Sequence, residues 1–143
     1  MKLTTKGRYA VTAMIDLACN AEQGPIPLAD ISTRQSISQS YLEQLFAKLR
    51  RNGLVDSVRG PGGGYTLAGA PERISIADII RAVDEPIQAT SCNNGEGDGC
   101  LGLSRCVTHH LWEQLGSHIY SYLESVNLAG LIRENRAAQT LKQ

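Results

Sequence analysis

A glycine-rich stretch between two strand-like segments constrains the fold of this chain more than any other feature of its sequence. It spans residues 60–64, with the sequence GPGGG, and lies between residues 54–59 and 65–67. Glycine and proline favour the tight reversals that join antiparallel strands. The stretch lacks the Lys-Ser/Thr pair of a phosphate-binding loop, and it leads into a strand rather than into the helix that a dinucleotide-binding fingerprint requires. We therefore expect a β-hairpin, whose turn either contacts a partner or binds nothing.

Three helical segments are expected before this hairpin. They span about residues 9–18, 28–35 and 40–51, and residues 36–38 form the turn between the second and the third. The first and third segments carry apolar residues at helical spacing: Val11, Met14, Ile15 and Ala18, then Leu42, Leu45, Phe46 and Leu49. Three short helices followed by a hairpin are the order of a winged helix-turn-helix, in which the third helix can enter the major groove of DNA. We therefore predict a mainly α-helical fold with a winged helix-turn-helix DNA-binding domain.

The polar face of the third predicted helix carries residues able to read DNA bases. Gln44 can bond an adenine edge, Ser40 several bases, and Glu43 the amino group of cytosine. Ser40 and Glu43 also match a Ser-x-x-Glu capping box, so a role in starting the helix explains Glu43 equally well. Arg59, beside the glycine turn, can reach into a minor groove. The full set of candidate DNA contacts, including residues suited to phosphate binding, is Ser38, Ser40, Tyr41, Glu43, Gln44, Lys48, Arg50, Arg51, Arg59 and Gly60.

Charge is distributed unevenly, although the chain of 143 residues has no net charge. Residues 1–60 carry eight Lys and Arg against five Asp and Glu, and the remaining residues carry six against nine. This asymmetry permits an anionic partner for the first part without requiring one. No apolar stretch is long enough to cross a membrane and no secretory signal begins the chain, so we expect a cytoplasmic protein with no membrane partner.

Cysteine and histidine residues gather in and just after a glycine-rich segment at residues 85–104. They are Cys92, Cys100, Cys106, His109 and His110. In a reducing compartment such a group indicates metal or redox chemistry, and thiolate and imidazole ligands suit zinc or an iron–sulfur cluster. The spacings are wider than the close pairs of structural zinc sites, which favours a cluster, with zinc or redox-active thiols as alternatives. If a helix begins near residue 105, either histidine lies near Cys106, and spacing does not choose between them.

The C-terminal part is expected to contain a helix capped by Ser75 and Asp78 and then a long helix over residues 105–132. The long helix carries an apolar stripe that one compact domain need not bury, which predicts a homodimer seam. The stripe is Leu111, Leu115, Ile119, Tyr122 and Val126. We interpret Cys19 as a small buried residue and His118 as a surface or interface residue. The predicted division is a DNA-binding domain (1–84), a cysteine-containing loop (85–104), a dimerisation helix (105–132) and a polar, mobile tail (133–143).

Four motifs point to a known family. They are LTTKGRYA at residues 3–10, SYLEQL at 40–45, VRGPGGGY at 58–65 and CVTH at 106–109. Together they closely resemble the IscR-type iron–sulfur cluster regulators, over residues 1 to about 131. The resemblance implies a winged-helix homodimer that represses or activates promoters of iron–sulfur assembly genes. An enzyme is not expected, because no nucleophile–base arrangement or cofactor loop is present.

The resemblance also implies the ligands of a 2Fe-2S cluster. Matched by position they are Cys92, Cys100, Cys106 and His109, although the spacing of the first two is wider than in that family. The implied partners are double-stranded DNA at promoter operator sites, a second copy of the chain, and cluster-assembly scaffold or carrier proteins. Glu43 is expected to link cluster occupancy to promoter choice, because its charge repels phosphates but accepts a hydrogen bond from a correctly placed cytosine.

Two other functions compete with this one. A nitric-oxide or redox sensor of the same fold would hold its cluster through different ligands, which His109 disfavours. A zinc-stabilised protein-interaction module would have no DNA target. Metal and sulfide analysis of the protein distinguishes all three.

Overall fold

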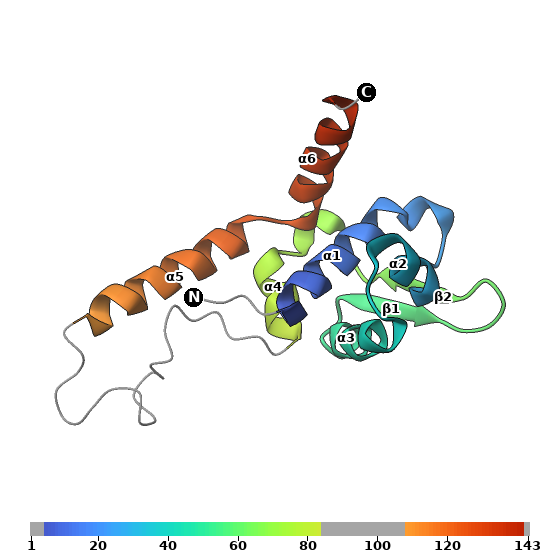
Figure 1. Cartoon of the computed structure of the whole chain (residues 1–143), viewed down its shortest axis with the longest axis horizontal. Helices are drawn as coiled ribbons and strands as arrows, with labels where there is room; N and C mark the ends of the chain where they lie inside the picture. The colour runs from blue at the N-terminus through green and yellow to red at the C-terminus, as the bar shows by residue number, and fades with distance from the viewer. Residues whose placement is uncertain (1–4, 84–107, 142–143) are drawn as a thin grey trace.

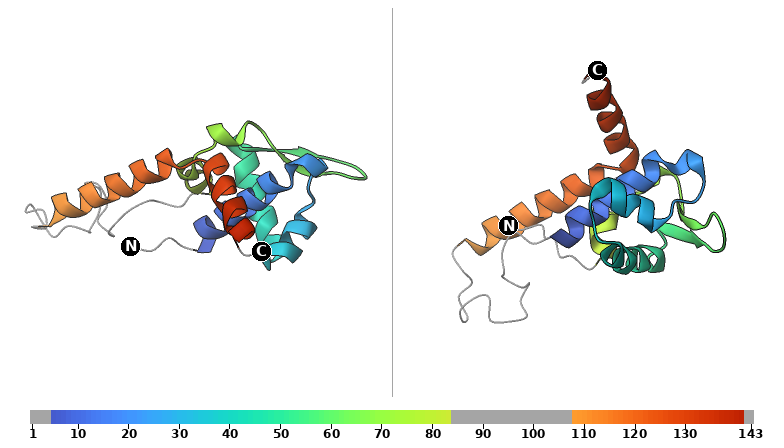
Figure 2. Two further views of the ribbon diagram at one scale, coloured as in Figure 1. Left: turned by 90° about the horizontal axis from the view of Figure 1, so that it is seen from above. Right: turned by 45° about the vertical axis from the view of Figure 1, so that its right-hand side comes forward.

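The structure, a computed structural model, describes residues 5–83 and 108–141. Helix α1 lies at the centre, the hairpin extends to one side, and α5 extends away from the other side in both Figure 1 and Figure 2. Helix α6 leaves the body in a third direction. The elements in chain order are α1 (Thr5–Cys19), η1 (Ala21–Gln23), α2 (Leu28–Gln35), α3 (Gln39–Arg51), β1 (Val55–Val58), β2 (Gly64–Leu67), η2 (Pro71–Arg73), α4 (Ile76–Ala82), α5 (His109–Ser125) and α6 (Leu128–Leu141).

Helix α1 forms the middle of the core because small residues on its buried face let other helices approach closely. It packs against α2, α3, α4, α6 and β2. Its fully buried apolar residues are Ala10, Ala13, Met14 and Leu17. The expected stripe was wrong in part, since only Met14 of it is fully buried, whereas Val11, Ile15 and Ala18 are partly buried at the edge of the core. The spacing pattern gave no weight to the two alanines, whose small size allows the closest packing.

The turn between α2 and α3 gives the helix-turn-helix its geometry. Ser36 ends α2 in the left-handed conformation, with φ of 56° and ψ of 42°. Ser38 then starts α3, because its hydroxyl oxygen accepts a hydrogen bond from the backbone N–H of Tyr41 at 3.1 Å. Ser40 therefore lies inside the helix, and the capping interpretation of Ser40 and Glu43 is wrong.

The expected hairpin is confirmed as an antiparallel pair of β1 and β2. Its turn closes through a hydrogen bond of 2.9 Å from the N–H of Gly63 to the carbonyl of Gly60. Pro61 and Gly62 occupy the central positions, and the φ of 75° at Gly62 is the value that a type II turn reserves for glycine. Tyr65 of β2 also exchanges two backbone hydrogen bonds of 2.9 Å with Ile26, which anchors the base of the hairpin to the loop before α2.

The C-terminal helices differ from the expected single long helix and mobile tail. Helix α5 begins at His109, after Thr108 in a turn, and ends at Ser125, while α6 continues to Leu141. The break arises because Asn127 starts a new helix, its Oδ1 accepting a hydrogen bond of 2.8 Å from the N–H of Gly130. The expected tail is helical because it is rich in Ala, Arg, Glu and Gln, which are good helix formers.

Helix α4 connects this C-terminal part to the core. The predicted capping box is confirmed, with the Ser75 hydroxyl accepting from the N–H of Asp78 and the Asp78 carboxylate accepting from the N–H of Ser75. The segment between α5 and α6 pairs with the start of α4, through hydrogen bonds of 2.9 Å from Ile76 N to Val126 O and 3.0 Å from Leu128 N to Ile74 O. None of the described helices is long and apolar enough to cross a membrane.

Candidate DNA-binding face and metal ligands

The start of α3 presents polar side chains to solvent beside its capped end. Its apolar residues Leu42, Leu45, Phe46 and Leu49 are buried, as predicted, so the opposite side faces outward. Ser40, Glu43 and Gln44 are exposed. Within the described part of the chain, the side chains of Glu43 and Gln44 make no hydrogen bond or ion pair. These two side chains are thus available to a partner in the groove of a nucleic acid.

Tyr41 is held in place by α1. Its ring meets that of Tyr9 edge to face, with 5.8 Å between ring centroids and 82° between planes. Tyr41 is partly buried against the core, whereas Ser38 and Ser40 beside it are exposed. Aromatic pairs of this geometry add to the attraction due to burial alone. Helix α1 thereby fixes the position of a candidate phosphate contact on α3.

The C-terminal end of α3 is tied to the hairpin. Arg50 Nη1 donates a hydrogen bond of 3.1 Å to the hydroxyl of Ser57 on β1. Arg51 is exposed on the same turn, and Arg59 and Gly60 are exposed in the hairpin turn. The positive φ of Gly60, 98°, is one that other residues rarely adopt. The hydrogen bond therefore joins the C-terminal end of α3 to β1 of the hairpin, and Arg51 and Arg59 are exposed on the helix and the hairpin that it connects.

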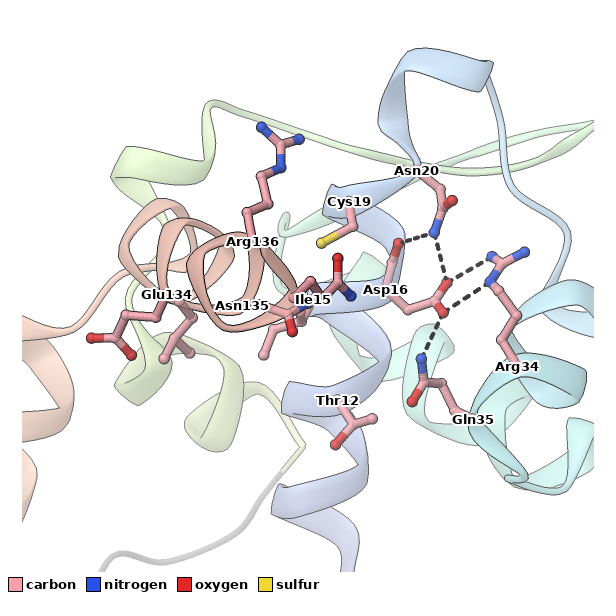
Figure 3. Close-up of a pocket in the computed structure, with 12 residues that line it drawn as sticks. Thr12, Ile15, Asp16, Cys19, Asn20, Arg34, Gln35, Glu134, Asn135 and Arg136 are labelled. Carbon is pink, nitrogen blue, oxygen red and sulfur yellow. Dashed lines mark hydrogen bonds and ion pairs between the residues drawn. The ribbon is translucent and has the colours of Figure 1, made fainter. Parts of the chain in front are cut away.

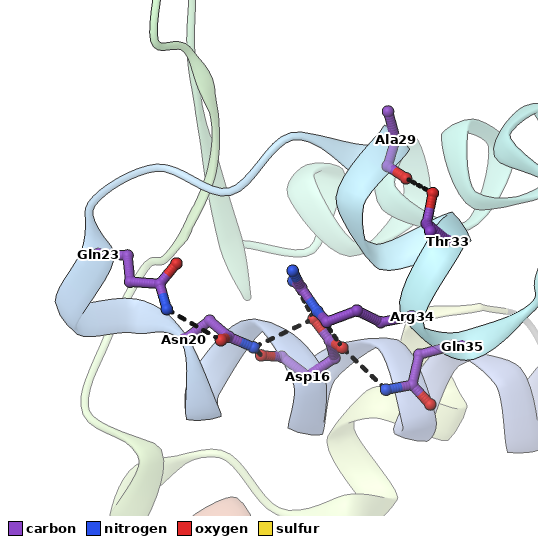
Figure 4. A network of polar contacts seen from close by, with 7 residues as sticks. All are labelled: Asp16, Asn20, Gln23, Ala29, Thr33, Arg34 and Gln35. Atoms are coloured by element: carbon purple, nitrogen blue, oxygen red, sulfur yellow. Dashed lines mark hydrogen bonds and ion pairs between the residues drawn. The ribbon is translucent and has the colours of Figure 1, made fainter.

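A buried carboxylate that the sequence gave no reason to single out fixes α2 against α1 (Figure 4). Asp16 accepts hydrogen bonds from Arg34 Nη2 at 2.7 Å, Arg34 Nε at 3.0 Å and Gln35 Nε2 at 2.8 Å. The hydrogen bond to Asp16 raises the pKa of Arg34 above its ordinary value, since the carboxylate favours the charged guanidinium. Its apolar neighbours Ile15 and Leu17 are a weak signal, because α1 also carries the charged residues Lys6 and Arg8.

A hollow of about 850 Å³ lies between α1, α2 and α6 (Figure 3). Cys19 and Ile15 line it, with the Cys19 sulfur directed toward it. Cys19 is partly rather than fully buried, so its interpretation as a small buried residue holds only in part. The carboxylate oxygens of Asp16 at the edge of the hollow accept hydrogen bonds from the protein itself.

The two candidate histidine ligands differ sharply in their surroundings. The side chain of His109 is 12% exposed, whereas that of His110 is 82% exposed. Each has one ring nitrogen 3.9 Å from a carboxylate oxygen of Glu113. His118, in the middle of α5, is exposed, which confirms its interpretation as a surface residue.

The cysteine part of the candidate metal site, Cys92, Cys100 and Cys106, lies outside the described residues. Within residues 5–83 and 108–141, no group of three or more His, Cys, Asp and Glu side chains could hold a metal ion. The expectation that a helix from residue 105 places Cys106 and His109 on one face is wrong, because Thr108 lies in a turn.

A scan of protein families gives the decisive comparison. The model of the family Rrf2, described as iron-dependent transcriptional regulators, matches residues 3–134. The chain belongs to the Rrf2 family. Among curated relatives, the HTH-type transcriptional regulator IscR of Aliivibrio salmonicida is 58% identical over 139 residues, which cover 97% of this chain and 82% of that protein. IscR of Vibrio cholerae is 57% identical, covering 97% of this chain and 79% of its own length.

Two solved structures of regulators have the same fold as this chain. IscR of T. potens superposes with a TM-score of 0.79 at 42% identity, covering 97% of this chain and 91% of its own. CymR of B. subtilis, a global cysteine regulator, superposes with a TM-score of 0.77 at 36% identity, covering 94% and 98%. The predicted winged-helix fold and the resemblance to IscR-type regulators are therefore confirmed. This Rrf2 protein is a DNA-binding transcription regulator and not an enzyme.

Proposed function

We propose that this Rrf2 regulator binds operator DNA as a homodimer, senses iron–sulfur supply through a 2Fe-2S cluster and controls iron–sulfur assembly genes. The observation that carries the proposal is the 58% identity to a regulator named IscR, together with the motif CVTH at residues 106–109. Scaffold or carrier proteins of cluster assembly are the proposed cluster donors. The division into a DNA-binding domain, a cysteine-containing loop and a dimerisation part belongs to the same proposal.

The donor set fits an iron–sulfur cluster. The proposed ligands are Cys92, Cys100, Cys106 and His109, three thiolates and one imidazole, which are the soft donors that such clusters take. The sheltered position of His109 supports its choice over His110, because a ligand shielded from water exchanges less readily. When bound, the cluster supplies a centre whose presence depends on iron and on oxidants. His109, as the first residue of α5, would join that centre directly to a helix packed on α4.

The face of α3 supports DNA recognition through Glu43 and Gln44. The carboxylate of Glu43 has no partner within the described part of the chain, so it is free to accept from the amino group of cytosine. Without such a donor, its negative charge opposes the approach of phosphates and of acceptor atoms on bases. Glu43 is therefore the proposed selector between two classes of operator, with cluster occupancy as the switch.

The apolar stripe of α5 supports a homodimer. Helix α5 is amphipathic, yet several of its large apolar side chains are exposed to solvent in this chain. The exposed fractions are 55% for Leu111, 38% for Trp112, 41% for Leu115 and 67% for Tyr122. Trp112 adds to the stripe predicted from sequence, which had not included it. Exposed apolar residues in one row on a helix that extends from the body favour burial against an equivalent helix. A second copy supplies such a helix in the correct register by symmetry.

The cluster is tested by comparing His109→Ala with His110→Ala in protein purified without oxygen. Iron, sulfide and zinc are measured together with the visible absorption spectrum. We expect iron and sulfide in the parent, an altered spectrum and faster cluster loss in His109→Ala, and a parent-like spectrum in His110→Ala. An unchanged spectrum in His109→Ala would favour the redox sensor with other ligands, and zinc without sulfide would favour the interaction module.

The role of Glu43 is tested by DNA binding of the cluster-free and cluster-loaded forms at one stated salt concentration. Duplexes preferred by each form are selected from a randomised pool. We expect the two forms to prefer different sequences in the parent and more similar sequences in Glu43→Ala. Glu22→Ala is the control, since Glu22 is an exposed carboxylate on η1. If Glu43→Ala leaves the preferences as different as in the parent, Glu43 is not the selector.

A further inference from the structure

The side-chain amide of Asn52 joins the end of α3 to the end of α4. Its Nδ2 donates to the carbonyl oxygen of Lys48, in the last turn of α3, at 2.8 Å. It also donates to the carbonyl oxygen of Ala82, the last residue of α4, at 3.3 Å. The backbone N–H of Asn52 also donates to the carbonyl oxygen of Lys48, at 3.1 Å, so the side-chain amide is a second donor at the end of α3. Carbonyls in the last turn of a helix lack a regular partner within the helix, and the same amide supplies a donor to that of Ala82 at the end of α4.

Helix α4 is in turn held by the C-terminal part of the chain. The guanidinium of Arg81 lies 5.4 Å from the centroid of the Tyr120 ring on α5. Residues at the start of α4 form two backbone hydrogen bonds with the segment between α5 and α6, from Ile76 N to Val126 O and from Leu128 N to Ile74 O. Among the described elements, α5 packs mainly against α4. A shift of α5 therefore acts on α4, the helix it packs against, and on α6, to which residues 126 and 127 join it.

We propose that Asn52 is a positioning residue that sets the angle and depth of α3 on DNA according to the position of α4. The regulatory part of this inference rests on the proposed function, because α5 begins at the proposed ligand His109. The positioning part does not, because the Asn52 bridge joins α3 to α4 without involving any of the proposed cluster ligands. A movement of α4 pulls on the Lys48 end of α3, while Ser38 and Tyr41 hold its other end, and this changes which bases Glu43 and Gln44 reach.

Two substitutions separate the bridge from the cap that Asn52 also provides. Asn52→Ala removes both hydrogen bonds. Asn52→Ser keeps a hydroxyl that can bond to the carbonyl four residues earlier but is too short to reach Ala82. Asn20→Ala is the matched control, since Asn20 donates to the carbonyl of Asp16 at 2.8 Å beyond the end of α1, in the same local arrangement and without a bridge to α4.

The first measurement uses cluster-free protein and duplexes selected by the cluster-free parent from a randomised pool. We compare affinity for these duplexes with affinity for an unrelated duplex of equal length at one salt concentration. We expect Asn52→Ala and Asn52→Ser to lower the ratio of the two affinities about fivefold to tenfold, the size of one well-placed hydrogen bond. Asn20→Ala keeps the ratio of the parent, although its melting temperature falls as in Asn52→Ala.

If both Asn52 variants keep the parent's ratio while Asn52→Ala alone is destabilised, Asn52 is only a helix cap and the inference is overturned. A second measurement repeats the selection with cluster-loaded protein, and we expect Asn52→Ser to reduce the difference between the two forms. If the parent itself shows no difference, the proposed cluster response is wrong, whereas the cluster-free ratio still decides the role of Asn52.

Discussion

Helices α3 and α5 are both amphipathic, yet within the described residues α3 buries its apolar face fully, whereas α5 is only partly covered, by α4 and the edge of the core. The 13 residues of α3 include four buried apolar side chains. The 17 residues of α5 include none that is buried in this chain. Leu115 of α5 is 41% exposed, whereas Leu45 of α3 is 1% exposed.

The difference shows that an amphipathic face specifies burial but not the surface that provides it. The hydrophobic effect is non-directional and depends on the area removed from water, so any matching apolar surface within reach satisfies it. The three-residue turn between α2 and α3 keeps α3 against the core. Helix α5 extends away from the core (Figure 2), and its apolar residues Leu111, Leu115 and Tyr122 stay exposed among the described residues.

Truncating the core side of α3 gives the largest expected effect. Phe46 is fully buried and its ring centroid lies 5.0 Å from that of Tyr65 on β2. We expect Phe46→Ala to lower the free energy of unfolding by about 3–5 kcal/mol through loss of burial and the cavity left behind. Urea denaturation measures this change, with Phe46→Leu as the milder control. A loss below that of Phe46→Leu would mean that this face is not packed as described.

Removing the carboxylate that fixes α2 gives the next largest effect. The Asp16 side chain is 2% exposed, and its partner Arg34 is 37% exposed. Because Arg34 can turn toward water, we expect Asp16→Ala to lower the free energy of unfolding by about 2 kcal/mol, less than for a fully buried pair. Urea denaturation is again the measurement. Asp30→Ala, at an exposed carboxylate on α2, should change little, and equal losses in both would contradict the role of Asp16.

Changing the exposed face of α5 should affect association rather than folding. We expect Leu115→Glu to raise the dimer dissociation constant at least about tenfold, since it places a charge in an apolar seam. Sedimentation velocity over a range of protein concentrations measures this constant. Ser117→Glu introduces the same charge on another side of α5 and should leave the constant unchanged. If both variants sediment as the parent does, α5 is not the dimer seam.

The contact between α5 and α4 gives the smallest effect, seen in the titration of Tyr120. Desolvation raises the pKa of Tyr120 above its ordinary value, and the charge of Arg81 partly opposes this. Because the folded pKa exceeds the unfolded one, this contribution to stability is complete below the unfolded pKa and declines as pH rises through the folded pKa. Tyrosinate absorbance of the parent minus Tyr120→Phe follows the titration, and Arg81→Gln should move its midpoint higher. A lower midpoint in Arg81→Gln would contradict the contact.

Elements that depend on a few consecutive residues could be predicted from the sequence. The helix at residues 28–35, the hairpin around Pro61 and Gly62 and the capping box of Ser75 and Asp78 are all present as expected. Each depends on backbone preferences of a few consecutive residues. The break at Asn127 was missed because a single capping asparagine is a weak signal within a helical pattern.

The sequence by itself determined the family, the order of helices and hairpin, and the residue types on the outer face of α3. Only the tertiary structure decided that His109 is sheltered while His110 is exposed, and that Asn52 bridges α3 and α4. The physical reason is the separation of the interacting residues along the sequence. Turns, caps and amphipathic faces arise from neighbours along the chain, whereas burial and bridges between helices arise from residues that only folding brings together.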